Sequence, residues 1–202
     1  MSLSELHLAL LLTSPRHGYE VKKQHDAWFP EAKPLAFGQV YATLGRLVRD
    51  GLAEVVETRS DGGPERTVYS VTVAGRERLE AWLSEPAPPA GSGGEDIVRK
   101  TVVALRTPRS GQSANEVVAR QRTAHLRRMR ELQQNGDEGT DVAVQLARRH
   151  AVLHLDADLR WLEEAVQTLS VRPAALGVGG GPAARPGDSS PAPSPHPMEG
   201  LA

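Results

Sequence analysis

Three polar residues in the segment 37–50 have side chains that could make specific contacts with a nucleic acid. Gln39 and Thr43 are four residues apart, and Arg46 follows about one helical turn later, so a helix would place them on one exposed face. Gln and Arg can each form two hydrogen bonds to a purine edge in the major groove of DNA. The spacing raises the hypothesis of a helix that contacts bases, against the alternative of an ordinary solvated helix face.

The apolar residues of the same segment predict the helix itself. They recur at helical spacing along one stripe: Val40, Leu44, Leu47 and Val48. Such a stripe packs on neighbouring elements, and Gly51 marks the end of the helix. The preceding sequence supplies two partners, because the spacing of its apolar residues predicts helices at roughly 3–13 and 17–28.

The period then changes from 3.6 to 2, which is typical of strands. The stretches LAEVVETR and ERTVYSV flank the turn-forming SDGG and predict a β-hairpin. Thr72 follows and can cap a further helix. The order helix, helix, helix, hairpin, helix is that of a winged helix-turn-helix domain.

We therefore predict a mainly α protein with a small β-hairpin, divided into four parts. Residues 1–85 would form the winged helix-turn-helix domain, and residues 86–94, rich in Pro, Gly and Ala, a flexible linker. Residues 95–171 would form a helical dimerisation and effector domain. Residues 172–202, also rich in Gly, Ala and Pro, would be a disordered tail.

The last predicted helix has an apolar seam that favours a homodimer. Its members step by four and three residues in turn: Leu155, Leu159, Leu162, Val166 and Leu169. This is the a/d alternation of packed helices. Two long amphipathic helices and a short one do not easily enclose a core alone, so we expect the seam to pair with a second copy.

Three segments carry a resemblance to a known family. HGYEVKK, GQVYATLGRLVRDGLAE and GGPERTVYSVTVAGRERLEAWL resemble, in order and spacing, the DNA-binding domain of the PadR family of bacterial transcription regulators. The resemblance covers about residues 1–85. It implies a homodimer formed through C-terminal helices and a small aromatic or drug-like effector. A dimer of winged domains matches the two-fold symmetry of a palindromic double-stranded operator. The resemblance also implies that Tyr41 contacts DNA, with a phosphate as the expected partner.

Basic residues outside the predicted recognition helix could bind the DNA backbone. Lys22 and Lys23 could each neutralise a phosphate, which adds affinity without sequence information. Arg59 and Arg66 flank the turn of the hairpin and could reach a minor groove or a neighbouring phosphate. Acidic residues in the same turn dilute this charge, so a wing that only closes the hairpin stays an alternative.

Two further features of the C-terminal half were weighed as binding sites. His150 and His154 have the spacing of a helical metal pair, but Asp156 and Asp158 would point to other faces and the spacing places no third ligand. The sequence therefore predicts no metal site. Trp161 lies beside the leucine seam and could stack on an aromatic effector, or it could be a half-buried packing residue.

Composition narrows the functional classes. The net charge is −1, which argues against bulk coating of nucleic acid but not against a site-specific binder. The chain has no cysteine, which excludes disulfides and thiolate catalysis and favours a cytoplasmic protein. No apolar run reaches the roughly 18 residues of a membrane span, so we expect no membrane partner.

Two functions remain, because the sequence contains no catalytic motif. It has no Gly-rich phosphate loop, GxSxG elbow or HExxH pair, so we expect neither an enzyme nor a cofactor. The favoured function is sequence-specific DNA binding as a transcription regulator, as a repressor. The alternative is a winged-helix module that binds another protein without contacting DNA.

Overall fold

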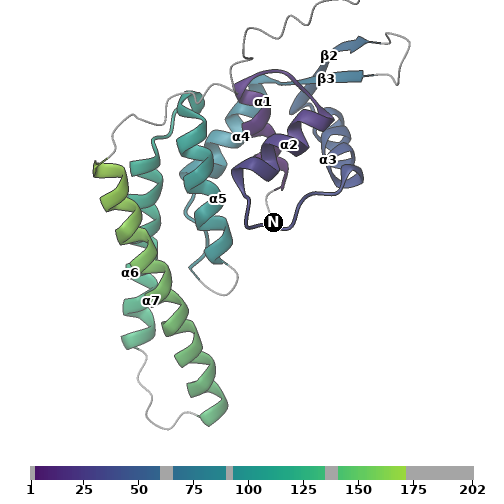
Figure 1. Ribbon diagram of the computed structural model, residues 1–202. Coiled ribbons are helices and arrows are strands. Elements are labelled where there is room, and N and C mark those ends of the chain that lie inside the picture. The colour runs from purple at the N-terminus through teal and green to yellow at the C-terminus, as the bar shows by residue number, and fades with distance from the viewer. Residues whose placement is uncertain (1–2, 60–65, 90–92, 135–140, 172–202) are drawn as a thin grey trace, which may run out of the picture.

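The computed structural model describes residues 3–59, 66–89, 93–134 and 141–171. Within these ranges the chain is mostly helical, with a three-stranded antiparallel sheet (Figure 1), which confirms the predicted fold class. The predicted tail at 172–202 lies outside the described residues.

The first part of the chain has the predicted order of helices and hairpin. Its elements are α1 (Leu3–Thr13), β1 (Arg16–His17), α2 (Gly18–Trp28), α3 (Phe37–Arg49), β2 (Ala53–Arg59), β3 (Arg66–Val71) and α4 (Val73–Ser84). The sheet order is β1-β3-β2. At the start of α4, the Thr72 hydroxyl accepts a hydrogen bond from the Gly75 N–H at 3.1 Å, so this residue caps the helix as predicted.

The hairpin contains one irregularity and gains a third strand. Between Val55 and Glu57 the pairing of β2 with β3 shifts by one residue, which is a β-bulge. On the other edge of β3, Arg16 pairs with Tyr69 and His17 with Val68. The wing is therefore tied to the segment that leads directly into α2.

The core is built around α1. Every residue of this helix from Glu5 to Leu12 is buried, as expected for a helix that is apolar on nearly all sides and lies in the middle of a domain. The same core includes residues from all three other helices of the winged part, and it continues into the C-terminal half through Val103, Ala104 and Val117. The two halves thus share one hydrophobic core.

The C-terminal half consists of α5 (Gly93–Arg106), a short 3-10 turn η1 (Pro108–Ser110), α6 (Ala114–Gln134) and α7 (Val142–Val171). The long helices α6 and α7 lie side by side, and α5 lies between them and the winged part (Figure 1). None of the described helices is long and apolar enough to cross a membrane.

The segment predicted as a flexible linker is anchored at one of its described positions. Ala87 is 2 % exposed and packs in a second core with Ile97, Val118 and Leu162. The backbone N–H and carbonyl of Ala87 are both hydrogen-bonded to the side-chain amide of Gln121. At Ala87 the expectation of a flexible linker is therefore corrected, because a buried backbone needs fixed partners.

Candidate nucleic-acid interface

Helix α3 presents an outer face of small and basic residues. Its apolar stripe is buried, with Val40, Leu44 and Leu47 at most 1 % exposed. On the opposite side Gly38, Ala42, Gly45 and Arg49 recur at helical spacing. A Cβ atom added at Gly38 or Gly45 would meet nothing within 4 Å. Another molecule could therefore approach this backbone closely.

The predicted contact residues of α3 do not share one surface. Tyr41, Arg46 and Gln39 are exposed, but Thr43 is only 2 % exposed. The prediction that Thr43 is an exposed contact is wrong, because position 43 lies between Val40 and Leu47 on the buried side of the helix. Its hydroxyl belongs to the core side of α3 and not to the outer face.

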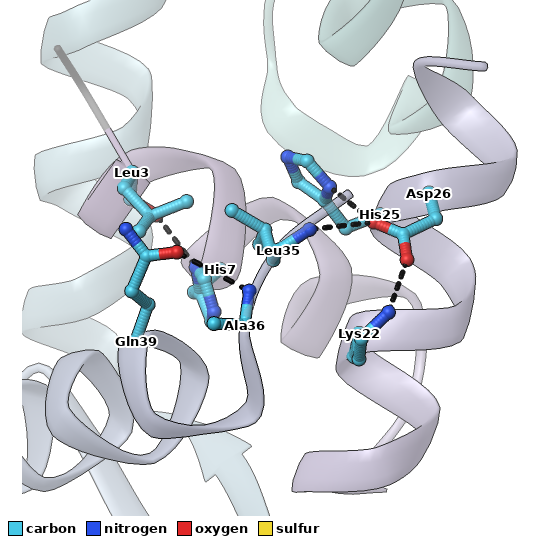
Figure 2. Close-up of polar contacts among 8 residues, drawn as sticks. All are labelled: Leu3, His7, Lys22, His25, Asp26, Leu35, Ala36 and Gln39. Atoms are coloured by element: carbon cyan, nitrogen blue, oxygen red, sulfur yellow. Dashed lines mark hydrogen bonds and ion pairs between the residues drawn. The ribbon is translucent and has the colours of Figure 1, made fainter. Parts of the chain in front are cut away.

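Gln39 also has a structural role at the start of α3. Its side-chain oxygen accepts a hydrogen bond from the Ala36 N–H at 3.2 Å (Figure 2), which satisfies one of the donors that a helix start leaves open. A contact between the Gln39 oxygen and a base would have to replace this bond.

Asp26 fixes the connection between α2 and α3. Figure 2 shows its carboxylate receiving the Lys22 ammonium at 2.6 Å, His25 at 3.2 Å and the Leu35 N–H at 3.2 Å. Burial alone would raise the pKa of this carboxyl, but the three hydrogen bonds outweigh it and the pKa lies below its usual value. The position of the loop before α3 thus depends on an ionised Asp26.

The two predicted phosphate-binding lysines differ in their surroundings. The Lys22 ammonium is paired with Asp26 and lies 5.4 Å from the centre of the Phe37 ring, over its face. The Lys23 side chain is exposed, and no ion pair is recorded for it in the described part of the chain. Lys23 is therefore the better placed of the two to bind a phosphate.

Aromatic rings join α2 to α3 on the exposed surface. Tyr19 and Phe37 stack with ring centres 6.0 Å apart and an interplanar angle of 13°, yet they are 60 % and 47 % exposed. Apolar rings left in water at the start of two adjacent helices favour contact with another molecule. Phe37 is not among the predicted contact residues, although its place at the first position of the helix indicates an exposed ring.

Tyr41 lies where α2, α3 and the wing meet. A Cβ atom at Gly18 would come within 2.5 Å of the Tyr41 ring, so only glycine leaves the ring this position. Burial and, after it, the nearby Tyr41 raise the pKa of Tyr69 on β3. Tyr41 is still 49 % exposed, so its ring is held on one side and open on the other.

The two wing arginines close the described part of the hairpin. Arg59 and Arg66 pair with each other across β2 and β3. Their side chains, and the whole turn between them, lie outside the described residues, so the prediction that they contact DNA stays a prediction.

A buried histidine lies beneath the recognition helix. His7 on α1 is 0 % exposed, and its Nδ1 lies 2.7 Å from the Leu3 carbonyl oxygen (Figure 2). Burial, and to a smaller extent His25 and Arg46, lowers its pKa to about 4. Near neutral pH this ring is therefore uncharged below α3.

The apolar seam of α7 faces its own chain at two of its five positions. Leu155 and Leu162 are 2 % and 0 % exposed. The area of these two residues is already buried within one chain, so neither offers exposed surface to a second copy, and the prediction of a dimer through the seam stays a prediction. Val166 is 39 % exposed, and Leu159 and Leu169 are half-buried.

Trp161 is half-buried beside the core formed around Ile97 and Leu162. Its place fits the packing residue of the sequence analysis, and the prediction that it contacts an effector stays untested.

The fold and this face define the class of protein: a winged helix-turn-helix domain with its third helix open to solvent. Residues 7–81 match the model of the Transcriptional regulator PadR-like family, so the winged part of the chain is similar to the domains of that family. The resemblance seen in the sequence is therefore confirmed, and the family is one of transcriptional regulators.

Comparisons with individual proteins gave more distant matches. A Mycobacterium tuberculosis protein described as a probable transcriptional regulator, Rv1176c, is 26 % identical over 93 residues, or 46 % of this chain and 49 % of that protein. The match thus spans about half the length of that relative.

Among solved structures, Bacillus subtilis PadR in complex with operator DNA is 18 % identical with a TM-score of 0.41, over 84 % of this chain and 99 % of that one. The same protein in complex with p-coumaric acid is 17 % identical with a TM-score of 0.36, over 83 % and 98 %. The Vibrio cholerae virulence activator AphA is 22 % identical with a TM-score of 0.37, over 84 % and 99 %.

Proposed function

We propose that this protein is a homodimeric transcription regulator, a repressor, that binds a palindromic operator and is released by a small-molecule effector. One observation carries the proposal: the outer face of α3, with Tyr41, Arg46 and Arg49 exposed, belongs to a domain that matches the PadR-like family over residues 7–81.

In this proposal α3 enters the major groove. Its small residues let the backbone approach the bases, and Arg46 forms two hydrogen bonds to a guanine. Gln39 contacts a neighbouring base edge through its amide. Tyr41 binds a phosphate at the groove wall, which fixes the register of the helix without specifying sequence.

The remaining basic residues bind the DNA backbone. Lys23, and Lys22 after exchange of its Asp26 partner, each neutralise a phosphate beside α2. Arg59 and Arg66 bring positive charge to the wing, which would lie over the adjacent minor groove or its phosphates.

Dimerisation through the C-terminal helices would place two copies of α3 about one helical turn of DNA apart, which matches a palindromic operator. The surface of α7 opposite the buried Leu155 and Leu162 carries Leu146 and Leu153, which are 67 % and 52 % exposed. We propose this surface as the contact with the second copy.

The effector would bind near the dimerisation helices, with Trp161 stacking on an aromatic ligand. It lowers operator occupancy only as far as it prefers the arrangement of the dimer that does not bind DNA. A panel of aromatic carboxylic acids tested for release of bound operator would identify such a ligand.

The test of the DNA-binding function is fluorescence anisotropy with the full chain. Labelled duplex from upstream of the protein's own coding sequence is compared with a shuffled duplex of equal length and composition. We expect binding at least a hundredfold tighter to the first, with two chains per site. Equal affinity for both duplexes would contradict sequence-specific recognition.

A further inference from the structure

Two histidines on α7 converge on one point outside the helix. His150 and His154 are one turn apart, and both are exposed. Their Nε2 atoms lie 2.8 Å from each other, and their ring centres are 4.1 Å apart at an angle of 51°. Neither ring is used by the proposed DNA contacts or by the helix packing.

This separation suits two neighbouring ligands of a transition-metal ion. Bonds from imidazole nitrogen to such an ion are about 2.0–2.1 Å long, so two ligands at a right angle lie about 2.9 Å apart. Tetrahedral ligands would lie about 3.3 Å apart by the same geometry. The observed 2.8 Å is the length of a hydrogen bond between the two rings, and a metal ion that replaces the shared proton would find two nitrogen ligands already side by side.

The missing third ligand, on which the sequence analysis rejected a metal site, does not exclude this geometry. No group of three or more His, Cys, Asp or Glu side chains suited to a metal occurs in the described ranges. Asp156 pairs with Arg160 at 2.9 Å, and Asp158 lies 3.4 Å from His125. Because both histidine rings are exposed, water can complete the coordination of an ion held by two nitrogens.

We propose that His150 and His154 form a chelating site for one divalent transition-metal ion, with Ni²⁺ or Cu²⁺ bound more tightly than Zn²⁺. The bound ion links two side chains that are one turn of α7 apart. It therefore stabilises the half of the helix that begins at Val142, where residues 142–147 are all exposed. Metal bound to the folded helix but not to the unfolded chain raises the stability of the fold.

The test is calorimetric titration of the tag-free full chain with Ni²⁺ in a buffer that does not bind metal. We expect one ion per chain, and a loss of affinity of about tenfold or more in both His150→Ala and His154→Ala. His196→Ala, which removes a histidine far along the sequence, is the matched control and should bind Ni²⁺ like the unchanged protein. Because the substituted rings are exposed, the circular dichroism of both variants should stay the same.

Thermal unfolding gives a second measurement. Ni²⁺ should raise the melting temperature of the unchanged protein and of His196→Ala, and should leave those of His150→Ala and His154→Ala unmoved. Equal Ni²⁺ affinity in all four proteins, or absence of saturable binding to the unchanged chain, would overturn the proposal.

Discussion

The side-chain amide of Gln121 in α6 binds both backbone groups of Ala87. Its oxygen accepts the Ala87 N–H at 2.7 Å, and its nitrogen donates to the Ala87 carbonyl at 2.8 Å. From α5, the Lys100 ammonium donates to the carbonyl oxygen of Trp82 at 2.6 Å and to that of Glu85. The chain that leaves the winged part is thus held by side chains of two C-terminal helices.

Further polar contacts connect Gln121, which binds Ala87, to α7. The Gln121 nitrogen lies 3.1 Å from Nδ1 of the buried His125, and the other ring nitrogen of His125 lies 3.4 Å from a carboxylate oxygen of Asp158. A displacement of α7 against α6 would therefore act on the segment at Ala87, just beyond the end of α4, through these contacts. This is a physical route by which a movement of the C-terminal helices could change the placement of the winged part.

Replacing Gln121 by Leu should destabilise the protein by about 2–4 kcal/mol, because two buried backbone groups of Ala87 lose their partners. Urea denaturation followed by circular dichroism measures the free energy of unfolding. Gln133→Leu, at an exposed site of the same helix, should change it by less than about 0.5 kcal/mol. Similar small effects for both variants would show that the two hydrogen bonds between Gln121 and Ala87 contribute little to the free energy of unfolding.

Gly18→Ala should weaken operator binding by about 1 kcal/mol or more, because the new methyl group displaces the Tyr41 ring and with it the hydrogen bond that we propose between Tyr41 and a charged phosphate. The cost to folding should be small, since the ring is half exposed and can move. Anisotropy of labelled operator measures the affinity. In a Tyr41→Phe background the Gly18 substitution should cost nothing further; a full additional loss there would mean that Gly18 acts by another route.

Acid should destabilise the fold partly through His7. Its folded pKa, about 4, lies below the unfolded value of roughly 6.5, so the neutral ring stabilises the fold at neutral pH, and this contribution is lost as the pH falls from 6.5 towards 4. Between pH 7 and pH 5 the loss is about 2 kcal/mol. In His7→Leu the pH dependence of the free energy of unfolding should shrink by that amount. An unaltered pH dependence in His7→Leu would contradict the assignment.

Leu153→Glu should convert the proposed dimer into a monomer, because it places a charge in the exposed apolar surface that we propose for the contact with the second copy. Sedimentation velocity measures the mass of the protein in solution. The affinity of Leu153→Glu for the operator should also fall, because a monomer would hold only one copy of α3 against the DNA. The matched control is Val73→Glu, which changes an apolar residue of α4 that is 72 % exposed. A dimer that survives Leu153→Glu would place the interface elsewhere.

Much of the winged part was predictable because its signals are local. The apolar period of α1, α2 and α3, the change to period 2, and the Thr72 cap are all properties of short segments. Strand β1 was not predicted, since two residues carry no period and their pairing with β3 is a tertiary contact. Ala87 was assigned to a linker on composition, which says nothing about a glutamine 34 residues further along the chain.

The site was less predictable than the fold. Thr43 is four residues from the exposed Gln39 and also four residues from the buried Leu47, and only packing decides such a border position. The seam of α7 posed a different problem. An a/d pattern shows that a helix has a partner, but it does not say whether Leu155 and Leu162 meet their own α6 or a second copy.

The central claim, specific DNA binding by the outer face of α3, is tested most directly by operator affinity across a salt series for the unchanged chain, Arg46→Ala and Arg130→Ala. We expect the logarithm of the affinity to fall linearly with that of the salt concentration, by about 0.9 per phosphate contact. Arg46→Ala should cost about 1–3 kcal/mol on the operator, and Arg130→Ala, on the exposed surface of α6, should cost nothing. Absence of binding to any duplex even at low salt would contradict the claim and favour a winged-helix module that binds protein.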